Sequence, residues 1–199
     1  MTPFHLLDAV AVPLDEANVD TDQLAPGRFL TQPVFAELLL HDRRFERDGT
    51  PRGDFVLNDL AYVGAQIIVS RRNFGVGSSR EFAVLALPAA GFCCVIAASF
   101  GDIFYNNCLQ NGVLPVALEE QAIDTLLRAL RAYPGLHVCV DLPSQTVKAS
   151  SCGPYPFSIN AVRKRCFLEG LDDIALTGRY SGQVAAFELD YYRAFPWLN

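Results

Sequence analysis

Residues 65–98 read AQIIVSRRNFGVGSSREFAVLALPAAGFCCVIAA, and this stretch decides the fold. It contains two continuous apolar runs, AQIIVS at 65–70 and FCCVIAA at 92–98, as expected of strands covered on both faces. A glycine-rich turn at 73–80 and a helical pattern over about 79–90 lie between the runs. A strand, a helix and a second strand in this order predict two parallel strands joined by a right-handed crossover.

The alternation continues toward the C-terminus. We expect a short helix over 102–110, a strand over 113–118, an amphipathic helix over 119–132 and a strand over 136–142. A turn rich in Ser, Gly and Pro (SSCGPYPFS, 150–158) and a helix containing 161–169 follow. Repeated strand–helix units predict the α/β class, with a mainly parallel sheet flanked by helices.

The organisation of the chain predicts one domain over 1–199. Its expected parts are an N-terminal segment (1–58) with an exposed loop at about 27–54, an α/β body (59–178) and a helical tail (180–199). Aromatic residues in the tail fall near helical spacing, which predicts a terminal helix docked on the body.

Composition excludes several classes of function. The 199 residues are 51% hydrophobic and carry a net charge of -6, which argues against sequence-independent nucleic-acid binding. No stretch approaches the roughly 18 apolar residues of a membrane span, and the N-terminus does not resemble a signal peptide, so we expect a cytoplasmic protein. Three scattered histidines and six cysteines without a C-x-x-C pair predict no metal site in this chain.

The glycine-rich turn holds the residues best suited to chemistry. Gly75 and Gly77 let backbone N–H groups approach a ligand closely, and the start of a helix favours anions. Ser78 and Ser79 can donate and accept hydrogen bonds, while the planar fork of Arg80 matches a carboxylate. The turn therefore predicts a carboxylate site.

A second interpretation of the turn stays open, because Ser78 and Glu81 also fit an S-x-x-E capping box. Nucleotide sites fail on spacing. A dinucleotide fingerprint needs a third glycine where Arg80 stands, and a phosphate-binding P-loop needs a lysine that is absent from this turn.

Four separated motifs together resemble one family. They are NFGVGSSREFA at 73–83, NVDTDQLAP at 18–26, SFGDIFYNNC at 99–108 and RKRCFLEGLDDI at 163–174. In this order they resemble the small subunits of 3-isopropylmalate dehydratase, the swivel-domain partner in the aconitase superfamily. The resemblance covers the whole chain.

The resemblance implies an aconitase-like swivelling β/β/α domain and a hydro-lyase that is inactive without its large subunit. The large subunit would carry a [4Fe–4S] cluster, and this chain would bind neither a cofactor nor a metal. The complex would move a hydroxyl between adjacent carbons of isopropylmalate, a small dicarboxylate, in leucine biosynthesis. Heterodimers and heterotetramers are both compatible with the resemblance, and homo-oligomer formation by the isolated chain stays open.

The resemblance also implies roles for individual residues. Ser78 and Arg80 match the catalytic residues, with Ser78 as the base. Arg80 and Ser79 match groups that bind the substrate carboxylates, with Gly75 and Gly77 in the same turn.

Segments before the turn match further parts of the site. Thr21 and Asp22 match a second strip of its wall. The loop after Pro26 lies where the family recognises the substrate's side chain, which makes Phe29 and Leu30 candidate contacts for an isopropyl group and Arg28 a candidate for a carboxylate. Core packing explains the two apolar residues equally well, and Arg28 could equally face solvent.

The departures from the family pattern keep two alternatives open. Val76 stands where the family has Cys, Phe82 where it has His, and Val84 and Leu85 where it has Pro-Trp. These changes are compatible with a paralogous hydro-lyase subunit for another substituted malate or maleate. They are also compatible with a non-catalytic interaction module that keeps the fold.

Overall fold

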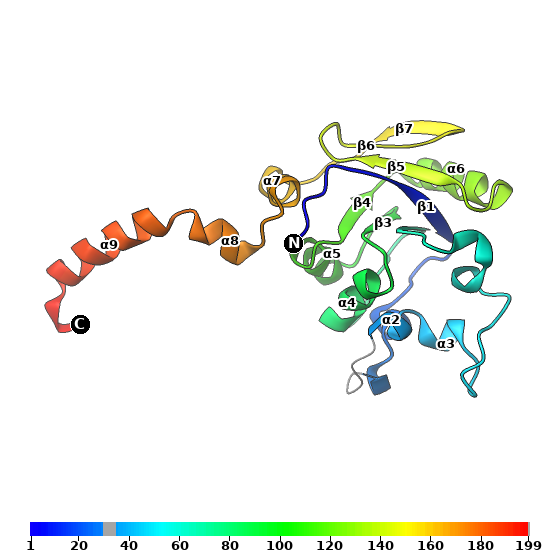
Figure 1. Cartoon of the computed structure of the whole chain (residues 1–199), viewed down its shortest axis with the longest axis horizontal. Coiled ribbons are helices and arrows are strands. Elements are labelled where there is room, and N and C mark those ends of the chain that lie inside the picture. The colour runs from blue at the N-terminus through cyan, green and yellow to red at the C-terminus, as the bar shows by residue number, and fades with distance from the viewer. Residues whose placement is uncertain (30–34, 199) are drawn as a thin grey trace.

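A seven-stranded sheet forms the centre of the protein, in the order β4-β3-β2-β1-β5-β6-β7 (Figure 1). The computed structural model describes residues 1–29 and 35–198. The strands are β1 (Leu6–Leu14), β2 (Ile67–Ser70), β3 (Cys94–Ala97), β4 (Leu114–Ala117), β5 (His137–Asp141), β6 (Thr146–Ala149) and β7 (Cys152–Pro156).

The sheet has a parallel half and an antiparallel half that share β1. β1 pairs in parallel with β2, with Ala11 opposite Ile67, and in antiparallel fashion with β5, with Leu7 opposite Val140. The α/β class and the parallel pairing of β2, β3 and β4 are confirmed. The sheet is parallel in its core, as predicted, and β5 through β7 add antiparallel pairs that the prediction did not specify. Their connections are short turns, which permit only hairpins.

The segment 150–158, expected to be a turn, contains strand β7 (Cys152–Pro156). Its prolines are tolerated because β7 lies at the edge of the sheet and pairs only with β6.

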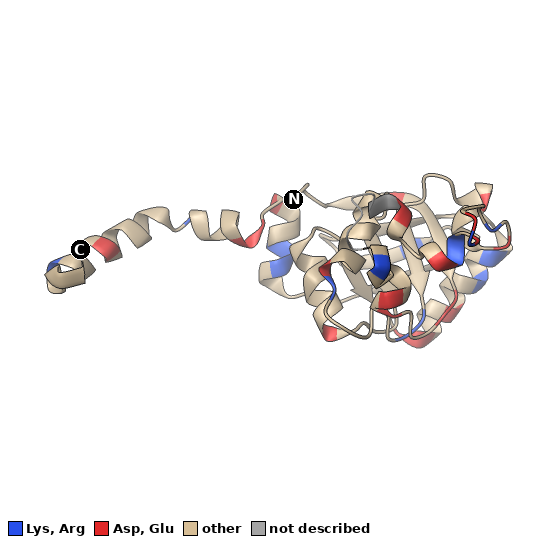
Figure 2. Cartoon of the chain, turned by 90° about the horizontal axis from the view of Figure 1, so that it is seen from below, with Lys and Arg blue, Asp and Glu red and all other residues tan. Residues whose placement is uncertain are grey.

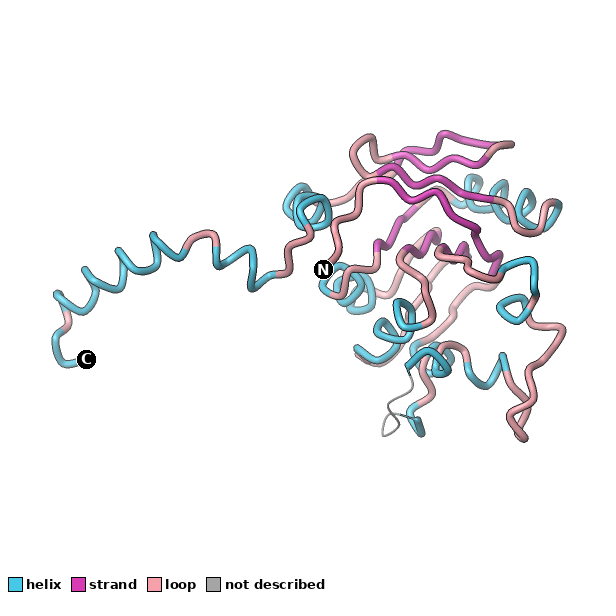
Figure 3. The backbone as a smooth tube through the Cα atoms, viewed as in Figure 1, coloured by secondary structure: helices cyan, strands magenta, loops and turns pink. Residues whose placement is uncertain are grey.

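Helices cover both faces of the sheet (Figure 3). Alternation along the strands sends Ile68 and Val95 into one apolar cluster and Ile67 and Ile96 into another, so each face has its own core. α4 packs with α2 in the first layer, and α6 crosses β1, β2 and β7 in the second. The helices of the body are α1 (Thr21–Leu24), α2 (Phe35–Leu38), α3 (His41–Arg44), α4 (Glu81–Ala89), α5 (Asp102–Gln110), α6 (Glu120–Ala132) and α7 (Ala161–Glu169), with short 3-10 turns at Gly27–Phe29, Val56–Asn58 and Leu60–Tyr62.

The edge of the sheet at the carboxyl ends of the parallel strands positions the candidate site. β1, β2 and β3 all end there, so the segments that follow them, near 15–24, 71–80 and 98–107, converge. Ligands of open α/β sheets bind at this edge.

The C-terminal tail does not dock on the body. α8 (Asp173–Gly178), α9 (Ser181–Ala194) and the 3-10 turn Pro196–Leu198 extend away from it (Figure 1), and neither helix has a buried residue. The predicted helix forms, but the predicted docking is wrong, because apolar spacing reports the faces of a helix and not what covers them. No helix in the described part of the chain has the length and apolar character needed to cross a membrane.

Candidate functional site

The glycine-rich turn is held by backbone hydrogen bonds to two other segments. The Gly75 amide donates to the Val19 carbonyl at 2.7 Å, and the Phe74 amide donates to the Ser99 carbonyl at 3.0 Å. On its far side the Thr21 amide donates to the Val76 carbonyl at 2.9 Å. The turn therefore bridges the segments that follow β1 and β3.

Close packing explains the first glycine of the turn. Gly75 has a φ of 72°, and a Cβ built there would lie 2.1 Å from the ring of Phe104, which is itself buried. Its amide already serves Val19, so Gly75 contributes shape to the turn rather than a free N–H for a ligand. The backbone φ of 109° at Gly77 likewise suits glycine, and this residue is exposed.

The segment 18–24 holds the glycine-rich turn through hydrogen bonds from Thr21. The Thr21 side chain is 2% exposed, and its hydroxyl donates to the Ser78 carbonyl at 2.9 Å. Asp20 caps α1 by accepting from the Gln23 amide at 2.7 Å. Thr21 therefore fixes the backbone of the residue expected to be the base, in addition to lining the same cleft.

A cleft of about 400 Å³ opens above the turn. Ser78 and Ser79 are exposed in it, and within the described residues their hydroxyls make no hydrogen bond. Gly75, Gly77 and Arg80 line the same cleft, so the five turn residues singled out from the sequence come together. The opposite wall comes from the segment after β3 and from α5: Phe100, Gly101, Asp102, Ile103, Phe104 and Asn107.

Those wall residues were missed as site residues. The motif SFGDIFYNNC contains them, and its position directly after a strand of the parallel half was the available signal. Asp102 and Asn107 add a carboxylate and an amide to a cleft whose sequence-predicted members are hydroxyls and a guanidinium.

Arg80 is held in place by a carboxylate. Its Nη1 donates to Asp22, whose side chain lies outside the cleft lining, and the Arg80 side chain is 24% exposed. Gly27 passes close to this ion pair, since a Cβ built there would lie 3.3 Å from Nη1 of Arg80. Asp22 thus contacts Arg80, and the guanidinium has further donors on Nη2 and Nε.

The capping-box interpretation is wrong. α4 begins at Glu81, later than the predicted start near 79, and its N-cap residue is Arg80, which makes no side-chain cap bond. Ser78 stands before the helix in the turn, where its hydroxyl is not engaged by α4.

The loop candidates occupy a second pocket. Arg28 donates to Asp42 at 2.7 Å, and the hydrogen bond from Arg28 lowers the pKa of the Asp42 carboxyl. The rings of Phe29 and His41 lie with their centroids 4.3 Å apart and tilted by 49°, and both residues line a pocket of about 730 Å³. Arg28 and Phe29 do not line the cleft of Ser78, and Leu30 lies outside the described residues.

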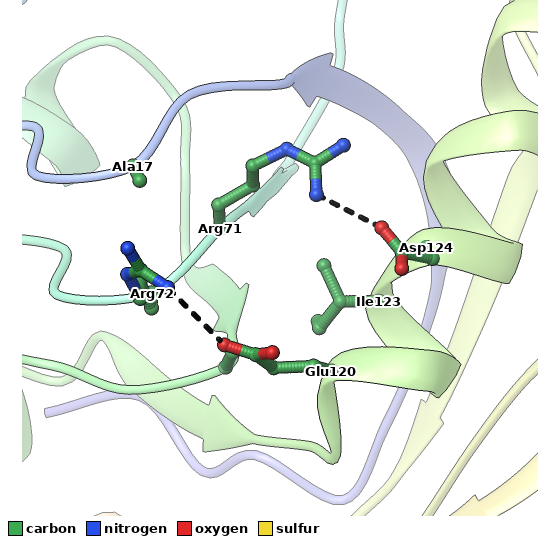
Figure 4. Close-up of a pocket in the computed structure, with 7 residues that line it drawn as sticks. Ala17, Arg71, Arg72, Glu120, Ile123 and Asp124 are labelled. Atoms are coloured by element: carbon green, nitrogen blue, oxygen red, sulfur yellow. Dashed lines mark hydrogen bonds and ion pairs between the residues drawn. The ribbon is translucent and has the colours of Figure 1, made fainter.

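A third pocket, of about 230 Å³, lies on the same edge of the sheet (Figure 4). Arg71 donates to Asp124 at 2.8 Å and also pairs with Asp15, and Arg72 lies 4.0 Å from Glu120. Glu120 and Asp124 are themselves part of this pocket's lining, and no serine or threonine of the described residues lines it, which makes the pocket a poor competitor for an anionic substrate.

Comparisons with known proteins agree on one family. A family model described as the aconitase C-terminal domain matches residues 1–121. The 3-isopropylmalate dehydratase small subunit of Brevibacillus brevis is 44% identical over 191 residues, covering 94% of this chain and 98% of the relative. The same subunit of Saccharophagus degradans is 40% identical, covering 100% and 98%. The crystal structure of 3-isopropylmalate dehydratase from Methanocaldococcus jannaschii superposes with a TM-score of 0.66 at 25% identity, covering 91% of this chain and 99% of that one.

Proposed function

Because this chain belongs to the family of 3-isopropylmalate dehydratase small subunits, we propose that its glycine-rich turn is one half of that enzyme's active site. A small subunit implies a large-subunit partner, which would supply the other half. Both curated relatives carry the dehydratase name, which favours a catalytic subunit over a paralogue or a non-catalytic module. The observation that carries the proposal is the cleft that gathers Ser78, Ser79 and Arg80.

The substrate is a malate derivative with two carboxylates, and the cleft offers groups that suit one of them. Arg80 uses Nη1 for Asp22, so the rest of its guanidinium fork can meet a substrate carboxylate. The Ser79 hydroxyl can donate to the same group. Asp22 keeps the fork at a fixed angle and so acts on binding through Arg80.

Ser78 would remove the carbon-bound proton next to the departing hydroxyl. An alcohol is a poor base, and the surroundings of Ser78 favour its alkoxide. The Arg80 guanidinium, two residues later, supplies a positive charge that stabilises an alkoxide, while Gly75 gives the turn its shape only, because its amide donates to Val19. Thr21 holds the Ser78 carbonyl, which limits the freedom of the base.

The described residues of this chain contain no group of three His, Cys, Asp or Glu side chains that could hold a metal ion, so they do not fit an iron–sulfur cluster. We place the [4Fe–4S] cluster that the aconitase superfamily implies in the large subunit.

The test compares Ser78→Ala with Ser151→Ala, an exposed serine in the turn before β7. Each variant is combined with the cognate large subunit, and turnover of isopropylmalate is measured. We expect Ser78→Ala to lose about 10²-fold or more of kcat, as loss of a general base typically does, while Ser151→Ala matches the wild type. Size-exclusion chromatography must show both complexes intact. Near-normal turnover by the Ser78→Ala complex would remove Ser78 from the mechanism.

A further inference from the structure

The large apolar side chains of the C-terminal arm, residues 173–198, are largely exposed and are not buried against the described body. Every residue from 177 to 198 is exposed, and Figures 1 and 2 show the arm leaving the body in two perpendicular views. Its exposed large apolar residues are Ile174, Tyr180, Val184, Phe187, Leu189, Tyr191, Tyr192, Phe195, Trp197 and Leu198.

An arm of this kind is not stable by itself. α9 has 14 residues, and an isolated helix of that length is marginal in water. Among the described residues, the ring–ring contacts of its aromatic side chains are with one another: Phe187 stacks on Tyr191 at 5.6 Å, and Tyr191 lies 5.0 Å from Phe195. The arm therefore needs a partner to bury these rings.

The exposed area is large enough for a protein interface. The accessible surface is 10641 Å², whereas a compact monomer of 21.9 kDa exposes about 9300 Å². The excess of roughly 1300 Å² exceeds the ~800 Å² that each partner contributes to a standard interface.

The distribution of apolar residues around α9 distinguishes between partners. At 100° per residue, Val184 and Tyr191 lie within about 60° of Phe187, whereas Tyr192 and Leu189 lie about 140° and 160° away. Pairing with the same helix of a second copy would cover one stripe and leave the far side in water. A helix that is apolar on several sides is one that a larger protein encloses.

We propose that the arm is a docking element that inserts into the large subunit of the dehydratase. The proposal rests on the proposed function, since membership of the small-subunit family is what implies that partner.

The arm leaves the body far from the cleft of Ser78. The arm follows α7 and Gly170, whose carbonyl accepts from the N-terminal amine of Met1 at 3.2 Å. Met1 lies against Gly112, just before the start of β4. The arm therefore leaves from the edge where the parallel strands begin, opposite the cleft at their carboxyl ends. Substitutions that weaken the arm's binding to the large subunit should therefore weaken assembly without changing turnover by the assembled enzyme.

The experiment removes apolar surface while keeping the helix. Phe187→Ala with Tyr191→Ala is compared with a matched double variant, Asp190→Ala with Arg193→Ala, which alters an exposed charged pair on the same helix and leaves the net charge unchanged. Alanine favours helix in all four positions. Binding of each full-length variant to the purified large subunit is measured by titration, and turnover is measured with the large subunit in saturating excess.

We expect the aromatic double variant to bind the large subunit about thirtyfold more weakly or worse, as loss of two buried aromatic anchors does, with kcat at saturation unchanged. The charged-pair variant should bind like the wild type. Equal binding by the aromatic variant would overturn the proposal. So would loss of a homodimer of the isolated chain with unchanged large-subunit binding, which would assign the arm to a second copy. A wild-type complex that binds normally but never turns over isopropylmalate would refute the proposed function and leave the binding comparison decisive for the arm.

Discussion

Replacing Gly75 with alanine tests how the site is built. The new methyl group would sit 2.1–2.6 Å from three ring carbons of Phe104, far inside van der Waals contact. Phe104 is 2% exposed and packs edge-on against Phe74 at 5.5 Å, so its ring cannot move without disturbing the core. The backbone φ of 72° is also unfavourable for alanine.

The magnitude follows from these two costs. A left-handed φ costs a non-glycine residue about 1–2 kcal/mol, and overpacking a core costs about 1–3 kcal/mol. Gly91→Ala is the matched control, because Gly91 has a φ of 92° but nothing within 4 Å of its Cβ position. Gly75→Ala should therefore lose about 1–3 kcal/mol more than Gly91→Ala in the free energy of unfolding, measured by urea denaturation. Equal losses would refute the packing argument.

Two further predictions concern charge and thiols. Asp22→Asn removes the carboxylate that holds Arg80, and the KM for isopropylmalate should rise about three- to fivefold with kcat nearly unchanged. An unchanged KM would show that Arg80 needs no such support. Burial raises the pKa of the Cys94 and Cys108 thiols well above the usual value, which disfavours the reactive thiolate. At pH 8 these two thiols should resist a disulfide reagent until urea unfolds the protein, and rapid labelling of all six cysteines in the native state would contradict their burial.

Continuous apolar runs made the parallel half of the fold predictable. The runs at 65–70 and 92–98 correspond to β2 and β3, and both strands are fully buried. β7 was not predictable in this way, because CGPYP has the composition of a turn and forms a strand only through its pairing with β6. At such an edge, pairing with a neighbouring strand outweighs the local preference of the residues for a turn.

The candidate site was predictable where a single segment builds it. Residues 75–80 carry their chemistry in consecutive positions, and the structure keeps them in one cleft. The opposite wall, with Asp102 and Asn107, depends on the convergence of a second segment, which spacing along the chain does not report. The position of Arg28 outside the cleft was not predictable for a similar reason. Its hydrogen bond to Asp42, a residue of another helix, also depends on the fold and not on local sequence.

Strand β1 has a consequence for how the protein is made. It is synthesised first, yet it lies in the middle of the sheet. There Ala11 pairs with Ile67 and Leu7 pairs with Val140, and both partners are synthesised later. At about 5–20 residues per second, a ribosome needs roughly 7–27 s to add the last of these partners. During that interval Leu6–Val10 lack their partners in β5, and Asp8 interrupts this apolar stretch in the way that residues opposing aggregation do. The parallel half can form once β4 has emerged, but β1 gains its second neighbour, β5, only when about two thirds of the chain has been made.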